Sequence, residues 1–357
     1  MKKIVLVLML AVTLTVLASC DGGKPTLKLF MPTEYIDEDL ITAFENEYDV
    51  RVEFISFDSN EIAIPQIEVN SYDLVIPSDY AIEELVSKDL LDPIDWSLVT
   101  TMTKEDLDTN LTSIIPSDTS FDILEYAVPY FWGNVGMLYD STKVTLAELE
   151  TEGWNALNTV EDDVMFYDSS RDMVMVALKA LYGGEVDINN PTSEQLSAAE
   201  TWLSDRERAS NVVFATDEIF DDMLEAGNTK YAIAVSYSGD ATYLMSENED
   251  LGYYVPTNGT NVWLDAFVVP KNAENKELAY QFISFFVSTE NMFANSSYVG
   301  YTAPRTNVVE QILAEEIYPS SSYRMQVGAN DSVFRYDTVN KAAIAELWPR
   351  VRASYSN

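Results

Sequence analysis

Near its start the chain reads LKLFM (Leu27–Met31), VRVEFIS (Val50–Ser56) and YDLVIP (Tyr72–Pro77), three short runs typical of buried β-strands. Between the first two, Asp37 fits a helix N-cap that precedes apolar residues at helical spacing. A further helix is predicted from about residue 81 to residue 88. This alternation of strands and helices predicts a parallel α/β sheet with right-handed crossovers.

The remainder of the chain continues the α/β pattern. Strands are predicted at residues 126–128, 136–139, 164–167 and 231–235, and in VWLDAFVVP (Val262–Pro270). Helices are predicted at residues 171–181, 193–203, 276–287 and 339–351, the last with a break near Pro349. Without residues 1–19, 357 − 19 = 338 residues remain. A chain of that length usually divides into two domains.

The N-terminus has the pattern of a secretory signal. Lys2 and Lys3 precede an apolar run from Ile4 to Leu17, which is shorter than the ~20 residues of a membrane span. The run ends in Leu-Ala-Ser-Cys, which resembles the bacterial lipoprotein cleavage box. We therefore expect residues 1–19 to be removed, Cys20 to carry lipid and residues 20–26 to form a short polar tether. The alternative is an ordinary signal peptide with a chance cysteine.

Composition excludes several kinds of chemistry. The chain has 21 basic and 59 acidic residues, a formal net charge of −38, and it has no histidine. Histidine triads and histidine metal sites are therefore impossible, and a single cysteine leaves no disulfide or cysteine zinc site. No phosphate-binding glycine loop is present. The charge repels nucleic acid and attracts small cations, although it also suits simple solubility.

Five loops are candidates for a ligand site, because ligands of open parallel sheets bind beyond the carboxyl ends of the strands. These loops are rich in hydroxyls, rings and carboxylates; they are residues 32–35, 77–80, 168–172, 237–240 and 263–265. Trp263 and Asp265 share one face of an apolar strand, where an acid requires a partner. The structural alternatives are that Trp263 is a core residue and that Asp240 caps a helix.

At these loops the chain resembles the spermidine/putrescine-binding proteins of bacterial ABC importers, which are polyamine-type members of extracellular solute-binding protein family 1. The matching stretches run through nearly the whole mature chain in the family's order: residues 33–36 (TEYI), 57–61 (FDSNE), 72–80 (YDLVIPSDY), 128–133 (VPYFWG), 238–241 (SGDA), 259–265 (GTNVWLD) and 299–304 (VGYTAP). The resemblance implies a two-lobe periplasmic binding protein-like fold of type II, in which each lobe is a mixed or parallel sheet flanked by helices. It implies one lobe of residues 27–135 with 266–304, a second of residues 136–265 with 305–357, and a hinge between them.

The resemblance also implies a set of ligand-binding residues. They are Thr33, Glu34, Tyr35, Ser78, Tyr80, Asp172, Tyr237, Asp240, Trp263, Asp265, Tyr301 and Arg335. Two positions depart from the family pattern, because Pro32 stands where the family has a tryptophan and Ser169 where it has a second acid. The implied function is a monomeric, lipid-anchored binding protein, without cofactor or metal. It would deliver spermidine or putrescine to ABC permease subunits, from the outer face of the cytoplasmic membrane or the periplasm.

A polyamine requires both carboxylates and flat apolar walls. A buried ammonium needs a counter-charge and acceptors for up to three donors. Asp265 is expected to hold one terminal ammonium, with Asp240 or Asp172 assisting, and Glu34 is the candidate for the other end. Rings such as Trp263 suit the methylene chain and also attract an ammonium.

Other readings stay open at this point. Different cationic cargo would need similar residues; examples are thiamine, a basic amino acid or an opine-like compound. A glycoside hydrolase using two carboxylates is the enzymatic alternative. Since 59 acids make some close pair inevitable, a pair alone does not indicate an enzyme. A passive adhesin or scaffold is the third class.

Overall fold

The computed structural model describes residues 23–33, 35–116 and 121–356. Its first sheet has the strand order β2-β1-β3 and is entirely parallel, as predicted. The strands are β1 (Thr26–Pro32), β2 (Arg51–Phe57) and β3 (Leu74–Val75), and the helices between and after them are α1 (Glu38–Tyr48), α2 (Asn60–Val69) and α3 (Asp79–Ser87). Asp37 caps α1 as expected, since its side chain accepts a hydrogen bond from the Asp39 N–H.

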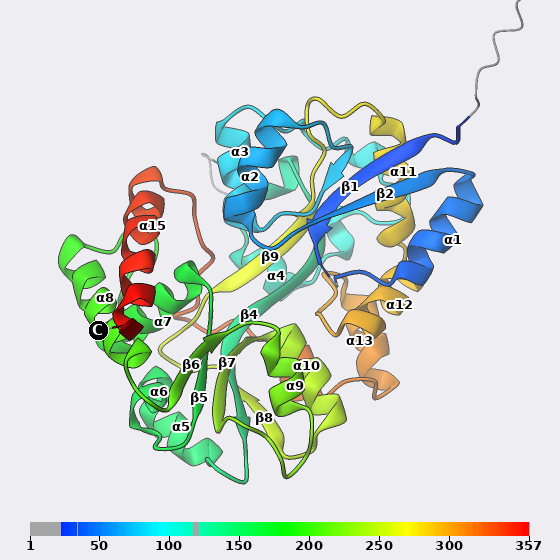
Figure 1. Cartoon of the computed structure of the whole chain (residues 1–357). Coiled ribbons are helices and arrows are strands. Elements are labelled where there is room, and N and C mark those ends of the chain that lie inside the picture. Colours follow the sequence, from blue (N-terminus) through cyan, green and yellow to red (C-terminus); the bar gives the residue numbers. More distant parts are fainter. Residues whose placement is uncertain (1–22, 34, 117–120, 357) are drawn as a thin grey trace, which may run out of the picture.

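One long strand, β4 (Val128–Asp140), connects the two halves of the molecule (Figure 1). Its first half pairs with β9 (Val262–Phe267), and its second half pairs with β7 (Ile233–Tyr237) and β8 (Leu251–Tyr254). The prediction of two separate short strands here was wrong. All thirteen residues of β4 are buried, so no alternation of apolar and polar residues marks the strand in the sequence.

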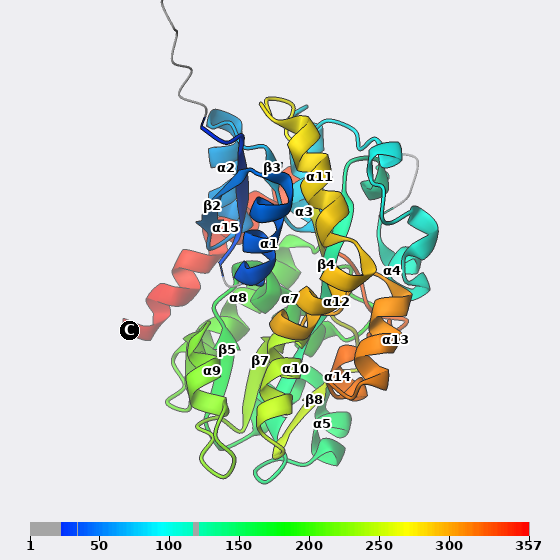
Figure 2. The ribbon, with the colours of Figure 1, turned by 90° about the vertical axis from the view of Figure 1, so that its right-hand side faces the viewer.

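The second sheet has the order β6-β5-β7-β4-β8. Strand β5 (Val164–Tyr167) is parallel to both β6 (Val212–Ala215) and β7, whereas β4 is antiparallel to β7 and β8. Helices flank both sheets (Figures 1 and 2): α4 (Thr109–Ile114), α5 (Leu146–Glu152), α6 (Ala156–Thr159), α7 (Ser170–Tyr182), α8 (Ser193–Glu207), α9 (Glu218–Met223), α10 (Ser238–Glu247), α11 (Lys276–Phe286), α12 (Thr289–Val299), α13 (Thr306–Ala314), α14 (Ser320–Tyr323) and α15 (Thr338–Ala353).

Helix α15 does not break at its proline, in contrast to the prediction. It runs continuously from Thr338 to Ala353, with Pro349 inside it. Proline removes one backbone donor, but Leu347 and Val351 on either side are buried. The helix packs against α7 and α8. This tertiary packing keeps the helix continuous despite the hydrogen bond that is lost at Pro349.

Strand β9 brings the first sheet close to β4. Beyond its ladder with β4, Asp265 of β9 is bridged to Ser78, and Val268, the residue after β9, is bridged to Val75. The loops that end β1, β3, β7 and β9 therefore meet near the middle of the molecule.

The division into lobes of residues 27–135 with 266–304 and 136–265 with 305–357 stays a prediction. Residues 1–19 and Cys20 lie outside the described residues, and no helix within the described ranges is long and apolar enough to cross a membrane.

Candidate ligand-binding site

Four aromatic rings from distant parts of the sequence form one continuous cluster between the two sheets. The centroid of Tyr35 lies 5.1 Å from that of Tyr301, which lies 5.4 Å from that of Trp263. The Trp263 ring lies 5.8 Å from Tyr237, and all three contacts are edge-to-face. Tyr35 follows β1, Tyr237 ends β7, Trp263 lies on β9 and Tyr301 follows α12. We call these four rings the ring cluster.

Each of three acids accepts a hydrogen bond from a hydroxyl of the ring cluster. Tyr35 donates to Asp265 Oδ2 at 2.9 Å, and Tyr301 donates to Asp240 Oδ1 at 2.5 Å. Tyr237 donates to Asp172 Oδ2 at 2.8 Å. The predicted acids and the predicted rings are therefore one connected assembly.

Three buried polar atoms of this assembly find no hydrogen-bond partner among the described residues. They are Asp172 Oδ1, Asp265 Oδ1 and the indole Nε1 of Trp263. Asp172 is 5% exposed and Asp265 is 9% exposed, so bulk water does not solvate these carboxylates freely. A buried acceptor without a partner costs ~1–3 kcal/mol, and more when it is charged. The two free carboxylate oxygens are therefore suited to receive donors from a bound molecule.

Burial sets the protonation of these acids. Burial raises the pKa of Asp265 to about 6, although the nearby hydroxyls of Ser78 and Tyr35 act in the opposite direction. It raises the pKa of Asp240 to about 7, against the hydrogen bond from Tyr301. The pKa of Asp172 is raised by burial as well. A bound cation would lower the pKa of these carboxyls again, since an opposite charge favours the ionised form.

Two glycines allow the ring cluster to pack this closely. A Cβ at Gly239 would lie 2.3 Å from the Tyr301 ring, and a Cβ at Gly133 would lie 2.5 Å from the Trp263 ring. Any side chain at either position would displace a ring of the cluster. Both glycines belong to stretches that carry the resemblance described above.

The other predicted ligand residues lie in different surroundings. Ser78 is bridged to Asp265 and accepts a hydrogen bond from Asn60 Nδ2 at 2.9 Å. Thr33 is exposed, and Glu34 lies outside the described residues.

Two further predicted residues are engaged with partners outside the ring cluster. The hydroxyl of Tyr80 donates to Glu61 Oε1 at 3.2 Å. Arg335 donates to both carboxylate oxygens of Glu83, at 2.8 and 3.0 Å. Direct ligand contact by these residues therefore stays a prediction.

Sequence reasoning missed the role of two residues at the start of α7. Ser169, which stands in place of a family acid, is the N-cap of α7 and donates from Oγ to Asp172 Oδ2 at 2.7 Å. The guanidinium carbon of Arg171 lies 4.0 Å from the centroid of the Tyr80 ring and 5.4 Å from that of the Phe334 ring. A serine that is followed three residues later by an acid is a helix-capping pattern, and this pattern could have indicated that Ser169 caps α7.

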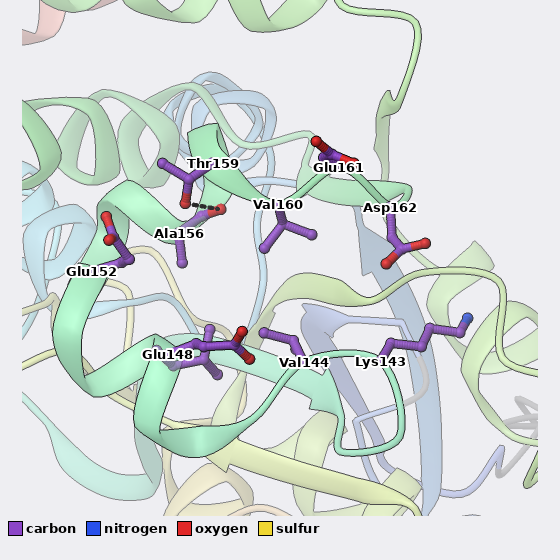
Figure 3. Close-up of a pocket in the computed structure, with 10 residues that line it drawn as sticks. Lys143, Val144, Glu148, Glu152, Ala156, Thr159, Val160, Glu161 and Asp162 are labelled. Atoms are coloured by element: carbon purple, nitrogen blue, oxygen red, sulfur yellow. Dashed lines mark hydrogen bonds between the residues drawn. The ribbon is translucent and has the colours of Figure 1, made fainter.

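A separate hollow of about 300 Å³ is lined by residues of α5, of α6 and of the segments before α5 and before β5 (Figure 3). Lys143, Glu148, Glu152 and Asp162 are among the side chains that line it, and none of them belongs to the ring cluster. A smaller hollow, of about 160 Å³, is lined by Asn134, Tyr253, Val255, residues 321–322 and residues 324–326. Within the described ranges no three His, Cys, Asp or Glu side chains are grouped so as to hold a metal ion.

Comparison with known proteins assigns the chain to a family. The model of the bacterial extracellular solute-binding protein family matches residues 39–319. The chain belongs to this family. Its members bind solutes and are not enzymes, so the expectation of a non-enzymatic protein is confirmed and the glycosidase alternative falls.

Individual relatives agree with this assignment. The putrescine-binding periplasmic protein SpuD of Pseudomonas aeruginosa is 26% identical over 89% of this chain and 90% of its own length. A solved structure from Listeria monocytogenes, described as a putative spermidine/putrescine ABC transporter, is 30% identical with a TM-score of 0.78. It covers 92% of this chain and 98% of its own. The spermidine/putrescine substrate-binding protein PotD of Streptococcus pneumoniae is 28% identical with a TM-score of 0.73, over 93% and 99% of the two chains. The predicted two-lobe α/β fold is confirmed.

The raised pKa values predict how the stability of the ligand-free protein depends on pH. Asp has a pKa of about 3.9 in an unfolded chain. Between about pH 4 and pH 7 the folded protein therefore keeps protons on Asp240 and Asp265 that the unfolded chain has released. The free energy of unfolding falls as the pH rises through this window and levels off above it.

Urea denaturation at a series of pH values measures this dependence. Asp240→Asn removes one titrating group, so the free energy of unfolding should decrease less with pH in this variant. Asp39→Asn, on the exposed face of α1, should show the same decrease as the wild type. Equal pH dependence in the wild type and in Asp240→Asn would show that Asp240 titrates normally.

Proposed function

We propose that this chain is the lipid-anchored receptor that captures a polyamine, spermidine or putrescine, and delivers it to an ABC importer. The observation that carries the proposal is the pair of free carboxylate oxygens, Asp172 Oδ1 and Asp265 Oδ1, buried beside four aromatic rings. The names of relatives, a putrescine-binding and a spermidine/putrescine-binding periplasmic protein, agree with it.

The chemistry of the assembly fits an oligocation with an apolar chain. Each terminal ammonium brings up to three hydrogen-bond donors and one positive charge. A buried carboxylate with a free oxygen needs a donor and a counter-charge, so the two groups complement each other. The faces of Trp263 and the neighbouring tyrosines suit methylene groups, and an ammonium against such a ring gains ~0.5–2 kcal/mol. A neutral sugar would leave the buried charges uncompensated, and burying an unpaired charge is costly.

Asp265→Asn tests the proposed counter-charge. It keeps the shape of the side chain and its contact with Tyr35 but removes the negative charge. We expect polyamine binding to weaken by at least ~2 kcal/mol, because one ammonium loses its charged partner. Titration calorimetry measures this, with Asp39→Asn as the control that makes the same change on the surface.

The same calorimetric panel separates the alternatives. It includes putrescine, spermidine, arginine, thiamine and a neutral sugar. Tight binding of polyamines alone supports the proposal. Exclusive binding of thiamine or arginine would replace the polyamine by another cationic cargo, and unchanged affinity in Asp265→Asn would remove Asp265 from the site.

We also propose that Cys20 carries the lipid anchor and that residues 20–25 form the tether, one residue shorter than predicted because Thr26 begins β1. The support comes from the residue pattern before Cys20 and from the start of β1 at Thr26, which leaves only a short connection. Two lipid signals hold a soluble domain at a bilayer, whereas a domain without any lipid is not held there. In the bacterial host, Cys20→Ala should move the protein from the membrane fraction to the soluble fraction. Unchanged membrane retention of this variant would contradict the anchor.

A further inference from the structure

A buried asparagine outside the ring cluster holds the segment that carries Tyr35. Asn295 lies on α12 and is 1% exposed. Its Oδ1 accepts a hydrogen bond from the Asp37 N–H at 2.9 Å, and its Nδ2 donates to the Tyr130 hydroxyl at 2.8 Å. The Tyr130 hydroxyl in turn donates to the Tyr35 carbonyl oxygen at 2.6 Å. One side chain of α12 is therefore connected to both ends of residues 35–37.

The chemistry of these groups determines which atom of the amide faces which partner. A backbone N–H can only donate, so the amide oxygen faces Asp37 and the amide nitrogen faces Tyr130. The Tyr130 hydroxyl accepts with a lone pair, which leaves its proton for the Tyr35 carbonyl oxygen. A buried network in which every member is satisfied makes its surroundings rigid. The network therefore restricts the position of residues 35–37 more than a single contact would.

This network reaches a carboxylate of the candidate site through Tyr35. The Tyr35 hydroxyl donates to Asp265 Oδ2 at 2.9 Å, and Asp265 Oδ1 has no partner among the described residues. The centroid of the Tyr35 ring lies 5.1 Å from that of Tyr301. Ser296, the residue after Asn295 on α12, donates to the Tyr301 carbonyl oxygen at 2.5 Å. Two consecutive residues of one helix therefore hold the segments that carry two neighbouring rings of the ring cluster.

We propose that Asn295 is a positioning residue for ligand binding, which acts through Tyr130 and residues 35–37 to set where the Tyr35 hydroxyl meets Asp265. This inference rests on the proposed polyamine function and adds a residue on which the geometry of the counter-charge depends. Because Tyr35 engages Oδ2 of Asp265, Oδ1 is the oxygen left for an ammonium. Binding groups must be held within ~0.5 Å of their productive position, and supporting hydrogen bonds provide this precision.

Asn295→Leu tests the proposal, because it keeps the approximate shape of the side chain and removes both of its hydrogen bonds. Titration calorimetry should show putrescine and spermidine bound at least ~10-fold more weakly than by the wild type. Tyr130→Phe, which removes only the hydroxyl between the amide and Tyr35, should weaken binding in the same direction. Wild-type affinity in both variants would overturn the inference and leave the polyamine function intact. A wild-type protein that binds neither amine would overturn the proposed function and the inference with it.

Asn248→Leu is the matched control. Asn248, the C-cap of α10, is as deeply buried and makes the same two kinds of hydrogen bond. Its Oδ1 accepts from the Asp250 N–H at 3.0 Å, and its Nδ2 donates to the Met223 carbonyl oxygen at 2.9 Å. Thermal unfolding should show a loss of stability in both leucine variants, whereas affinity should fall only in Asn295→Leu. An equal loss of affinity in the two variants would overturn the inference, because general destabilisation would then explain the effect.

A second measurement follows the contact between Tyr35 and Asp265 without any ligand. Burial raises the pKa of Asp265, and the hydroxyls of Ser78 and Tyr35 lower it. Tyr35→Phe should therefore raise the pKa of Asp265 further, and Asn295→Leu should raise it as well, since the hydroxyl is no longer held in place. NMR titration of protein with labelled aspartate carboxyls measures this pKa, and Asp265→Asn identifies the signal. An unchanged or lower pKa of Asp265 in Asn295→Leu would overturn the inference.

Discussion

Carboxylates buried without a permanent cation are the constraint on which the site depends. Removing an ionised carboxylate from water costs several kcal/mol unless a partner compensates the charge. Asp265 and Asp240 each accept a hydrogen bond from one tyrosine hydroxyl, and burial raises the pKa of both carboxyls. A small cation bound at this site would supply the counter-charge that these buried carboxylates lack.

The scaffold keeps these groups together because β4 and its partner β9 lie where the two sheets meet. Strand β4 pairs with β9 on one side of its midpoint and with β7 on the other, so Trp263 and Tyr237 come within ring contact. The bridge from Asp265 to Ser78 adds the end of β3 to the same place. The absence of a side chain at Gly133 leaves the space that the Trp263 ring fills.

Much of this could be predicted from the sequence. The parallel order of β1, β2 and β3 followed from local patterns, and the pairing of Trp263 with Asp265 on one strand face indicated a buried acid. The full extent of β4 could not be predicted, because a strand buried on both faces carries no alternating pattern. The position of Arg171 was also hidden, since the rings of Tyr80 and Phe334 that hold it come from segments far apart in the chain. Long-range contacts of this kind have no local signature.

Proton release on binding tests the central claim most directly. Calorimetric titration of putrescine at pH 6.5, in buffers of different ionisation enthalpy, counts the protons exchanged. Since Asp240 and Asp265 are partly protonated without ligand and must ionise to hold a cation, binding should release on the order of one proton per ligand. Tight binding without any proton release would show that these acids do not provide the counter-charge.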